Sequence, residues 1–185
     1  MQNLKISAAI LAAAGGMLLP AGCGDMGKVE QGRVIAYDAA ARQVTLIRDP
    51  GVLPPVTVAA PADPEEMGPA PAAGGLMRLD VKNHRMVIYD RAAQQLRTVD
   101  YTPVAEQHDV AKGPAAPAID RAKRTITIYA AREHVLITFT ASDDLLAMPA
   151  STWRAGDVVR YYYKDPAQAL RLMNVTQTDL SKQKG

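Results

Sequence analysis

Apolar residues recur at every second position in several short stretches along the body of the chain. Thr125-Ile126-Thr127-Ile128 alternates strictly, and residues 135–140 are mostly β-branched or aromatic. A period of two is typical of a strand with one buried face. Polar stretches that begin with aspartate, at 38–42 and 120–123, separate such segments. They suit hairpin loops because aspartate can accept hydrogen bonds from its own downstream backbone. The pattern predicts an all-β, mainly antiparallel protein.

These segments also repeat. Residues 79–89 return forty residues later as 119–129, and the same offset relates 96–99 to 136–139. An earlier segment, 34–44, is similar to 87–96. Each unit is an apolar strand, a polar stretch of about four or five residues and another apolar strand. The repeat predicts a barrel or sandwich built from hairpins.

Two stretches interrupt the repeat. Residues 59–75 are rich in Pro, Ala and Gly, and residues 102–117 are polar and contain proline. Both have too few apolar residues for strands, so we expect two long loops, which are either functional or plain surface excursions. Residues 142–147 predict one short helix, with Ser142 as its cap. Because the repeat continues across the second loop, we expect a single domain over 23–185.

The N-terminus reads as an export signal. Residues 1–22 hold Lys5, an apolar stretch at 6–19, and the small residues Ala21 and Gly22 directly before Cys23. The apolar stretch is shorter than the roughly 20 residues that span a bilayer, which favours a signal peptide. Cys23 is the only cysteine, so it has no disulfide partner within the chain.

The sequence around Cys23 resembles the lipobox of bacterial lipoproteins, with Pro20 at the position where an aliphatic residue is usual. This resemblance implies a membrane anchor of acyl chains such as palmitate on Cys23. An ordinary secreted protein with a free N-terminal cysteine is the alternative. Gly24 stands where an acidic residue would favour inner-membrane retention, so the location we expect is the cell envelope, facing the periplasm, with the outer membrane favoured over the inner membrane.

Charge and motifs argue against several classes of protein. The 21 basic and 19 acidic residues give a formal net charge of +2. The sequence also has no run of basic residues that could contact successive phosphates, so nucleic-acid binding is not expected. There is no Gly-x-Ser-x-Gly elbow, Walker loop or dinucleotide fingerprint. His84, His108 and His134 are far apart and make no metal-ligand spacing. We therefore expect no catalytic residue, metal or cofactor, and no enzyme.

A group of large side chains is the candidate partner or ligand surface. Tyrosine rings are apolar and can also form hydrogen bonds, so exposed tyrosines could bind a glycan or a protein, while packing within the sheet is the alternative. Thioethers favour Cu(I), so Met148, Trp153 and Met173 could instead form a soft-metal site. The candidate surface consists of Met148, Trp153, Tyr161, Tyr162 and Tyr163.

The chain resembles known proteins at two levels. Residues 119–176, with paired strands, a plug-like segment and Gly156-Asp157, resemble a small barrel of the OB type. Across the whole chain the resemblance is to a family of lipoproteins of unknown function from sulfate-reducing bacteria, carried by residues 23–29, 31–35, 153–157, 161–164 and 169–174. The expected function is a membrane-anchored, non-enzymatic β module that binds a partner protein or envelope component. The alternative is a periplasmic carrier of a small ligand or metal.

Overall fold

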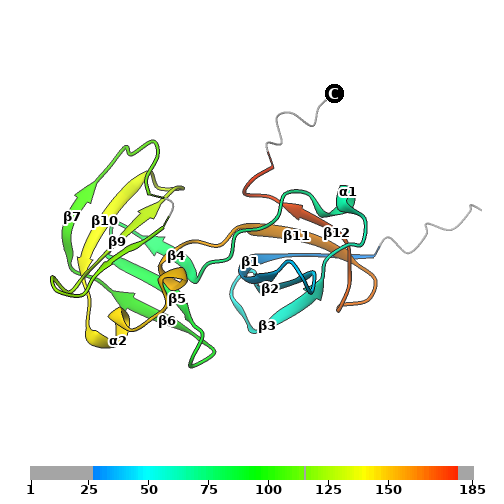
Figure 1. Cartoon of the computed structure of the whole chain (residues 1–185), viewed down its shortest axis with the longest axis horizontal. Coiled ribbons are helices and arrows are strands. Elements are labelled where there is room, and N and C mark those ends of the chain that lie inside the picture. The colour runs from blue at the N-terminus through cyan, green and yellow to red at the C-terminus, as the bar shows by residue number, and fades with distance from the viewer. Residues whose placement is uncertain (1–26, 115, 179–185) are drawn as a thin grey trace, which may run out of the picture.

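The computed structural model describes residues 27–114 and 116–178 as two β-rich lobes (Figure 1). The first lobe contains both ends of the described chain, and the second contains its middle. Cys23 and the expected signal peptide lie outside the described residues. In the described part, no helix is long and apolar enough to cross a membrane. The predicted all-β, antiparallel class is confirmed.

The first lobe is one curled antiparallel sheet with the strand order β12-β11-β1-β2-β3. Its inward faces enclose a core of Val34, Leu46, Tyr161 and Leu172 with their neighbours. The sheet's two edges approach at a parallel bridge between Ala59 and Gln168. The lobe consists of β1 (Lys28–Asp38), β2 (Gln43–Arg48), β3 (Val52–Ala59), α1 (Pro64–Met67), β11 (Val158–Tyr163) and β12 (Ala169–Asn174).

The second lobe is a sandwich of two sheets, in the orders β7-β10-β9-β8 and β4-β5-β6. Trp153 packs edge-on against Phe139 with ring centroids 5.7 Å apart, and Phe139 contacts Tyr101 at 5.5 Å. The lobe consists of β4 (Leu76–Asp80), β5 (Arg85–Asp90), β6 (Gln95–Asp100), β7 (Pro103–Gln107), β8 (Ala118–Asp120), β9 (Thr125–Ala130), β10 (Val135–Thr140), α2 (Asp143–Leu146) and the 3-10 helix η1 (Ala150–Trp153).

One type of hairpin recurs in both lobes. Five hairpins have four-residue loops, and in each the fourth loop residue has a positive φ between 49° and 55°. In four of them the aspartate before the loop accepts a hydrogen bond from the backbone N–H three residues later. The predicted Asp-led hairpin loops and the forty-residue repeat are confirmed. The positive-φ residues are Arg42, His84, Gln94, Arg124 and His134.

The chain passes between the lobes twice, along neighbouring paths. The outgoing segment at Gly74–Leu76 lies beside the returning segment at 154–156, with a parallel bridge from Leu76 to Ala155. Gly156 has no space for a side chain, since a Cβ there would lie 1.9 Å from the Val34 carbonyl oxygen. A small apolar cluster of Ile35, Ile47 and Tyr89 joins the two lobes beside this crossing.

Of the two expected architectures, a barrel or a sandwich, the sandwich is confirmed by the second lobe, whereas the described strands form no closed barrel and the OB-like C-terminal part is wrong. The strands within 119–176 belong to different lobes, because β8–β10 join the second-lobe sandwich and β11–β12 join β1. The first-lobe sheet is curled but not closed, since its edges meet at a bridge rather than along a ladder.

The short helix predicted at 142–147 is present as α2, but α1 and η1 accompany it. The two expected loops also contain regular structure. Segment 59–75 includes α1, whose first turn is capped by the Asp63 carboxylate. Segment 102–117 includes β7, which pairs with β10. β7 is an edge strand with a single ladder and no fully buried residue, so it forms without the apolar face that an inner strand needs.

Candidate functional site

The structure does not bring the five residues of the candidate surface together. Trp153 and Met148 pack in or against the second-lobe core, whereas Tyr161 and Tyr163 are buried in the first lobe. Tyr162 points to the opposite face of β11 and is half-buried. Trp153 is only 1% exposed and Tyr161 only 2%. These residues therefore contribute mainly to packing. The hydroxyl groups of the two buried tyrosines, however, bind Glu30, which lines a pocket.

The pocket arises because β1 is longer than the strand beside it. β1 pairs with β11 from Lys28 to Arg33, but its ladder with β2 begins only at Gly32. A Cβ at Gly32 would lie 2.4 Å from the Ile47 carbonyl oxygen, so glycine allows β1 to approach β2 closely. Before Gly32 the two strands separate and leave a gap.

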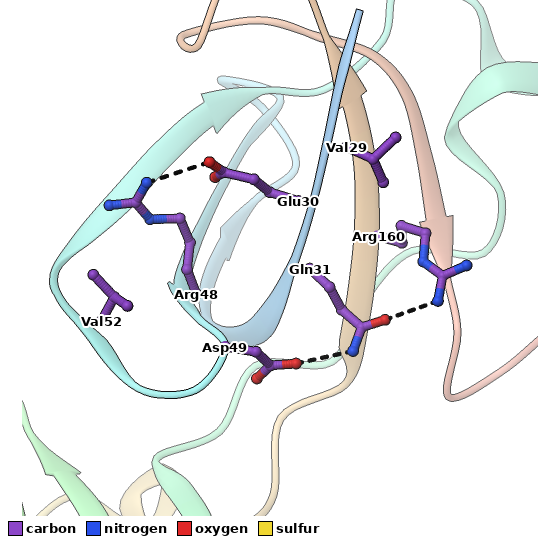
Figure 2. A pocket seen from close by; sticks show the side chains of 7 residues that line it. All are labelled: Val29, Glu30, Gln31, Arg48, Asp49, Val52 and Arg160. Carbon is purple, nitrogen blue, oxygen red and sulfur yellow. Dashed lines mark hydrogen bonds and ion pairs between the residues drawn. The ribbon is translucent and has the colours of Figure 1, made fainter.

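We call this gap the Glu30 pocket. It has a volume of about 550 Å³, within the range of roughly 300–1,000 Å³ typical of small-ligand sites. Figure 2 shows the Glu30–Arg48 pair on one side of β1 and Gln31, between Asp49 and Arg160, on the other. The pocket is lined by Val29, Glu30, Gln31, Arg48, Asp49, Val52 and Arg160.

Glu30 is held by two tyrosine hydroxyls. Tyr161 donates to Glu30 Oε2 at 2.6 Å and Tyr163 donates to Oε1 at 2.9 Å, while their rings stack 5.3 Å apart. Arg48 Nη1 lies 3.4 Å from Oε1. Residues two apart on a strand share a face, which is why Tyr161 and Tyr163 both reach the carboxylate.

These contacts fix the charge of the cluster. The hydrogen bond from Tyr161 is the main cause that lowers the pKa of Glu30, helped by Tyr163 and Arg48 and opposed by burial. Burial, and then the bond to Glu30, raises the pKa of Tyr161, and the bond to Glu30 raises that of Tyr163. Near neutral pH the cluster is thus a carboxylate with two neutral phenols. Such a group can position a ligand, but it offers no base with a pKa near 7.

The outer part of the pocket is a chain of polar contacts. Gln31 donates through Nε2 to Asp49 Oδ2 at 2.9 Å, and its Oε1 accepts from Arg160 Nη2 at 3.1 Å. Val29 and Val52 flank these groups and are 50% and 41% exposed. The pocket therefore combines two guanidinium groups, two carboxylates and apolar surface that faces solvent.

The histidines lie elsewhere. His84 and His134 occupy hairpin loops and His108 follows β7, and all three belong to the second lobe. His84 Nε2 is 3.4 Å from Glu106 Oε1, and His108 Nε2 is 3.7 Å from Oε2. Within the described ranges, no group of three or more His, Cys, Asp or Glu residues could hold a metal ion.

The sequence pattern did not predict Glu30, Arg48 or Arg160 as site residues. The sequence did contain a hint of the role of Glu30. Glu30 lies two residues before Gly32 and four before Val34, so its side chain is on the same inward face of β1. A charged residue at such a position calls for a partner. The partners come from β11, about 130 residues away in the chain, and no local pattern specifies them.

Fold and pocket define a two-lobed, all-β protein with a charged pocket at one sheet. The chain belongs to the family of the domain of unknown function DUF4881, whose model matches residues 25–183. This agrees with the expectation of an uncharacterised family. Neither the curated proteins nor the solved structures include a match to this chain.

Proposed function

We propose that this protein is a membrane-anchored, non-enzymatic binding module of the cell envelope. Lipid on Cys23 holds it at the membrane, facing the periplasm, and the Glu30 pocket binds a partner protein or another envelope component. The observation that carries the proposal is the pocket itself, whose carboxylate is fixed by two tyrosines and whose rim exposes valines.

The position of the pocket in the chain supports this proposal. Val29 follows Cys23 by six residues, so at about 3.5 Å per extended residue it lies within roughly 21 Å of the anchoring residue. A partner bound there would be held close to the membrane. Gly24 after the cysteine favours the outer membrane.

Lipid attachment is tested by metabolic labelling. Cells that express the full chain should incorporate labelled palmitate into it, and Cys23→Ala should remove the label. Equal labelling of both forms would refute the anchor, while a protein released in soluble form from washed membranes would point to the secreted alternative.

Binding is tested by site-specific photo-crosslinking in the native envelope. A photoreactive residue at Val52, on the rim of the pocket, should yield a discrete product. The matched control is Val104 on β7, which is 59% exposed and belongs to the other lobe (Figure 1). The same products from both positions, or none from Val52, would refute a partner at the pocket.

A small-ligand carrier is the second candidate, and the observation in its favour is the volume of the pocket. It predicts that native mass spectrometry of protein purified from the envelope finds a bound small molecule, which the Arg48→Gln variant lacks.

A further inference from the structure

Both carboxylates of the Glu30 pocket accept hydrogen bonds from other side chains of the protein, whereas one of the pocket's donors has no partner among the described residues. Both Glu30 oxygens accept from tyrosines, and Asp49 accepts from Gln31. Arg48 Nε, in contrast, is buried and has no hydrogen-bond partner in the described part of the chain. A buried donor without a partner can be satisfied by an acceptor from another molecule, of which water is the simplest case.

Arg48 favours an anionic acceptor, and Arg160, on the other side of β1, adds positive charge to the same pocket (Figure 2). The guanidinium of Arg48 contacts Glu30 only through Nη1, at 3.4 Å, and that of Arg160 contacts Gln31 through Nη2. Guanidinium groups present several donors in a plane that matches the two oxygens of a carboxylate. The pocket thus offers charged donors to a carboxylate.

The backbone of β1 is open at the same place. The Gln31 carbonyl accepts from the Asp49 N–H, on the β2 side of the strand. Residues two apart in an antiparallel strand direct their backbone groups to the same side, so Val29 presents its N–H and C=O there as well. The ladder with β2 begins at Gly32, so Val29 lacks a ladder partner on that side among residues 27–114 and 116–178. An extended chain could pair at such an edge.

Apolar side chains flank this edge. Val29, Val52 and Leu53 are exposed at 50%, 41% and 37%. Side chains of an added strand alternate between its faces, so one set could pack on these residues while a carboxylate reaches Arg48. The volume of about 550 Å³ suits a few residues rather than a helix or a domain.

We propose that the Glu30 pocket binds a short extended segment of a partner protein that carries a carboxylate next to apolar residues. Arg48 binds the carboxylate, Arg160 adds positive charge at longer range from the other side of β1 (Figure 2), and Val29 supplies backbone pairing. This inference rests on the proposed function, in which the anchored module binds a partner, and it names the partner's chemistry.

The test is an NMR titration of the full chain carrying Cys23→Ser and labelled with nitrogen-15. The probe is an acetylated valine–threonine pentapeptide with a free C-terminal carboxylate, and its C-terminal amide is the comparison. The carboxylate form should shift the Arg48 Nε–H and Val29 N–H signals and bind about tenfold or more tightly than the amide. Arg48→Gln should abolish this difference and Arg160→Gln should reduce it, whereas Arg85→Gln, in the second lobe, should retain it.

Several results would overturn the inference. Equal binding of carboxylate and amide peptides would remove carboxylate recognition. Shifts at Arg48 caused by a short-chain phosphatidylglycerol or by inorganic phosphate, but not by the peptide, would assign the pocket to a lipid headgroup or a free anion. An Arg48 Nε–H signal that none of the probes moves would indicate a water partner. A crosslinked partner at Val52 combined with a failed titration would reject this ligand class and leave the binding module intact.

Discussion

Replacing Glu30 with glutamine should destabilise the first lobe by about 2 kcal/mol. The carboxylate accepts charge-assisted hydrogen bonds from Tyr161 and Tyr163, each worth about 1.5–3 kcal/mol. The Glu30 side chain is 28% exposed, so the lower end of that range applies, and the two bonds together contribute about 3 kcal/mol. The amide oxygen of glutamine can still accept one neutral hydrogen bond worth about 1 kcal/mol, so the net loss is about 2 kcal/mol.

The sign of the pH dependence follows from the lowered pKa of Glu30. A carboxyl group whose folded-state pKa is depressed adds stability above its unfolded pKa of about 4.3, and this stability is lost as the pH falls through the folded value. The difference between wild type and Glu30→Gln should therefore be full at pH 7 and shrink at acidic pH. Other carboxyl groups with lowered pKa values, such as Asp144 at about 2, are present in both proteins and cancel in the difference.

The assay is urea unfolding followed by circular dichroism at several pH values. Glu66→Gln is the matched control, because Glu66 forms an exposed pair with Arg171 at 3.3 Å and should contribute at most about 0.5 kcal/mol. If Glu30→Gln is as stable as wild type at pH 7, or if the difference does not shrink in acid, the assigned role of the tyrosine–carboxylate cluster is wrong.

Three other substitutions test the fold by the same unfolding assay. Asp157→Ala should cost about 3 kcal/mol, because the wholly buried Asn174 amide donates to Asp157 at 2.8 Å and would keep only its longer contact with the Pro69 carbonyl, at 3.4 Å; no loss would mean that water replaces the carboxylate. Arg124→Val should cost about 1–2 kcal/mol, since a β-branched residue fits poorly at a φ of 55°, whereas the neighbouring Lys123→Val should change stability by less than about 0.5 kcal/mol; equal effects would contradict the hairpin geometry. Gly156→Ala should cost at least about 2 kcal/mol, since the new methyl group would meet backbone atoms at the crossing; a neutral result would show that the two connecting segments can separate.

Much of the local structure could be predicted from sequence because its causes are local. Strand alternation and Asp-led loops each involve only a few neighbouring residues, and they located the hairpins. The sequence also predicts that Tyr161 and Tyr163 share one face of the strand and that Tyr162 lies on the other, because alternate residues of a strand point to opposite faces. Which face lies inward depends on how the whole sheet curls, so the pattern alone left packing and an exposed platform as alternatives.

The pairing of strands and the pocket could not be predicted in the same way. β1 pairs with β11 across most of the chain, and the segment between β10 and β11 crosses from one lobe to the other. Residues 119–176 therefore showed the strand content of a small barrel while supplying two separate sheets. The pocket depends on where the β2 ladder stops, and Gly32 was the one sequence feature that marked this point.

The double crossing between the lobes has a consequence for the order of assembly. The second lobe is one continuous piece of chain from β4 to η1, so all its strands are available once residue 153 has emerged. The first lobe needs β11 and β12 to complete its sheet, and it must wait for the last part of the chain. During synthesis, the lobe that begins nearest the N-terminus is therefore the last to close. Loss of β11 and β12 would remove the first lobe and its pocket, while every strand of the second lobe would still be present.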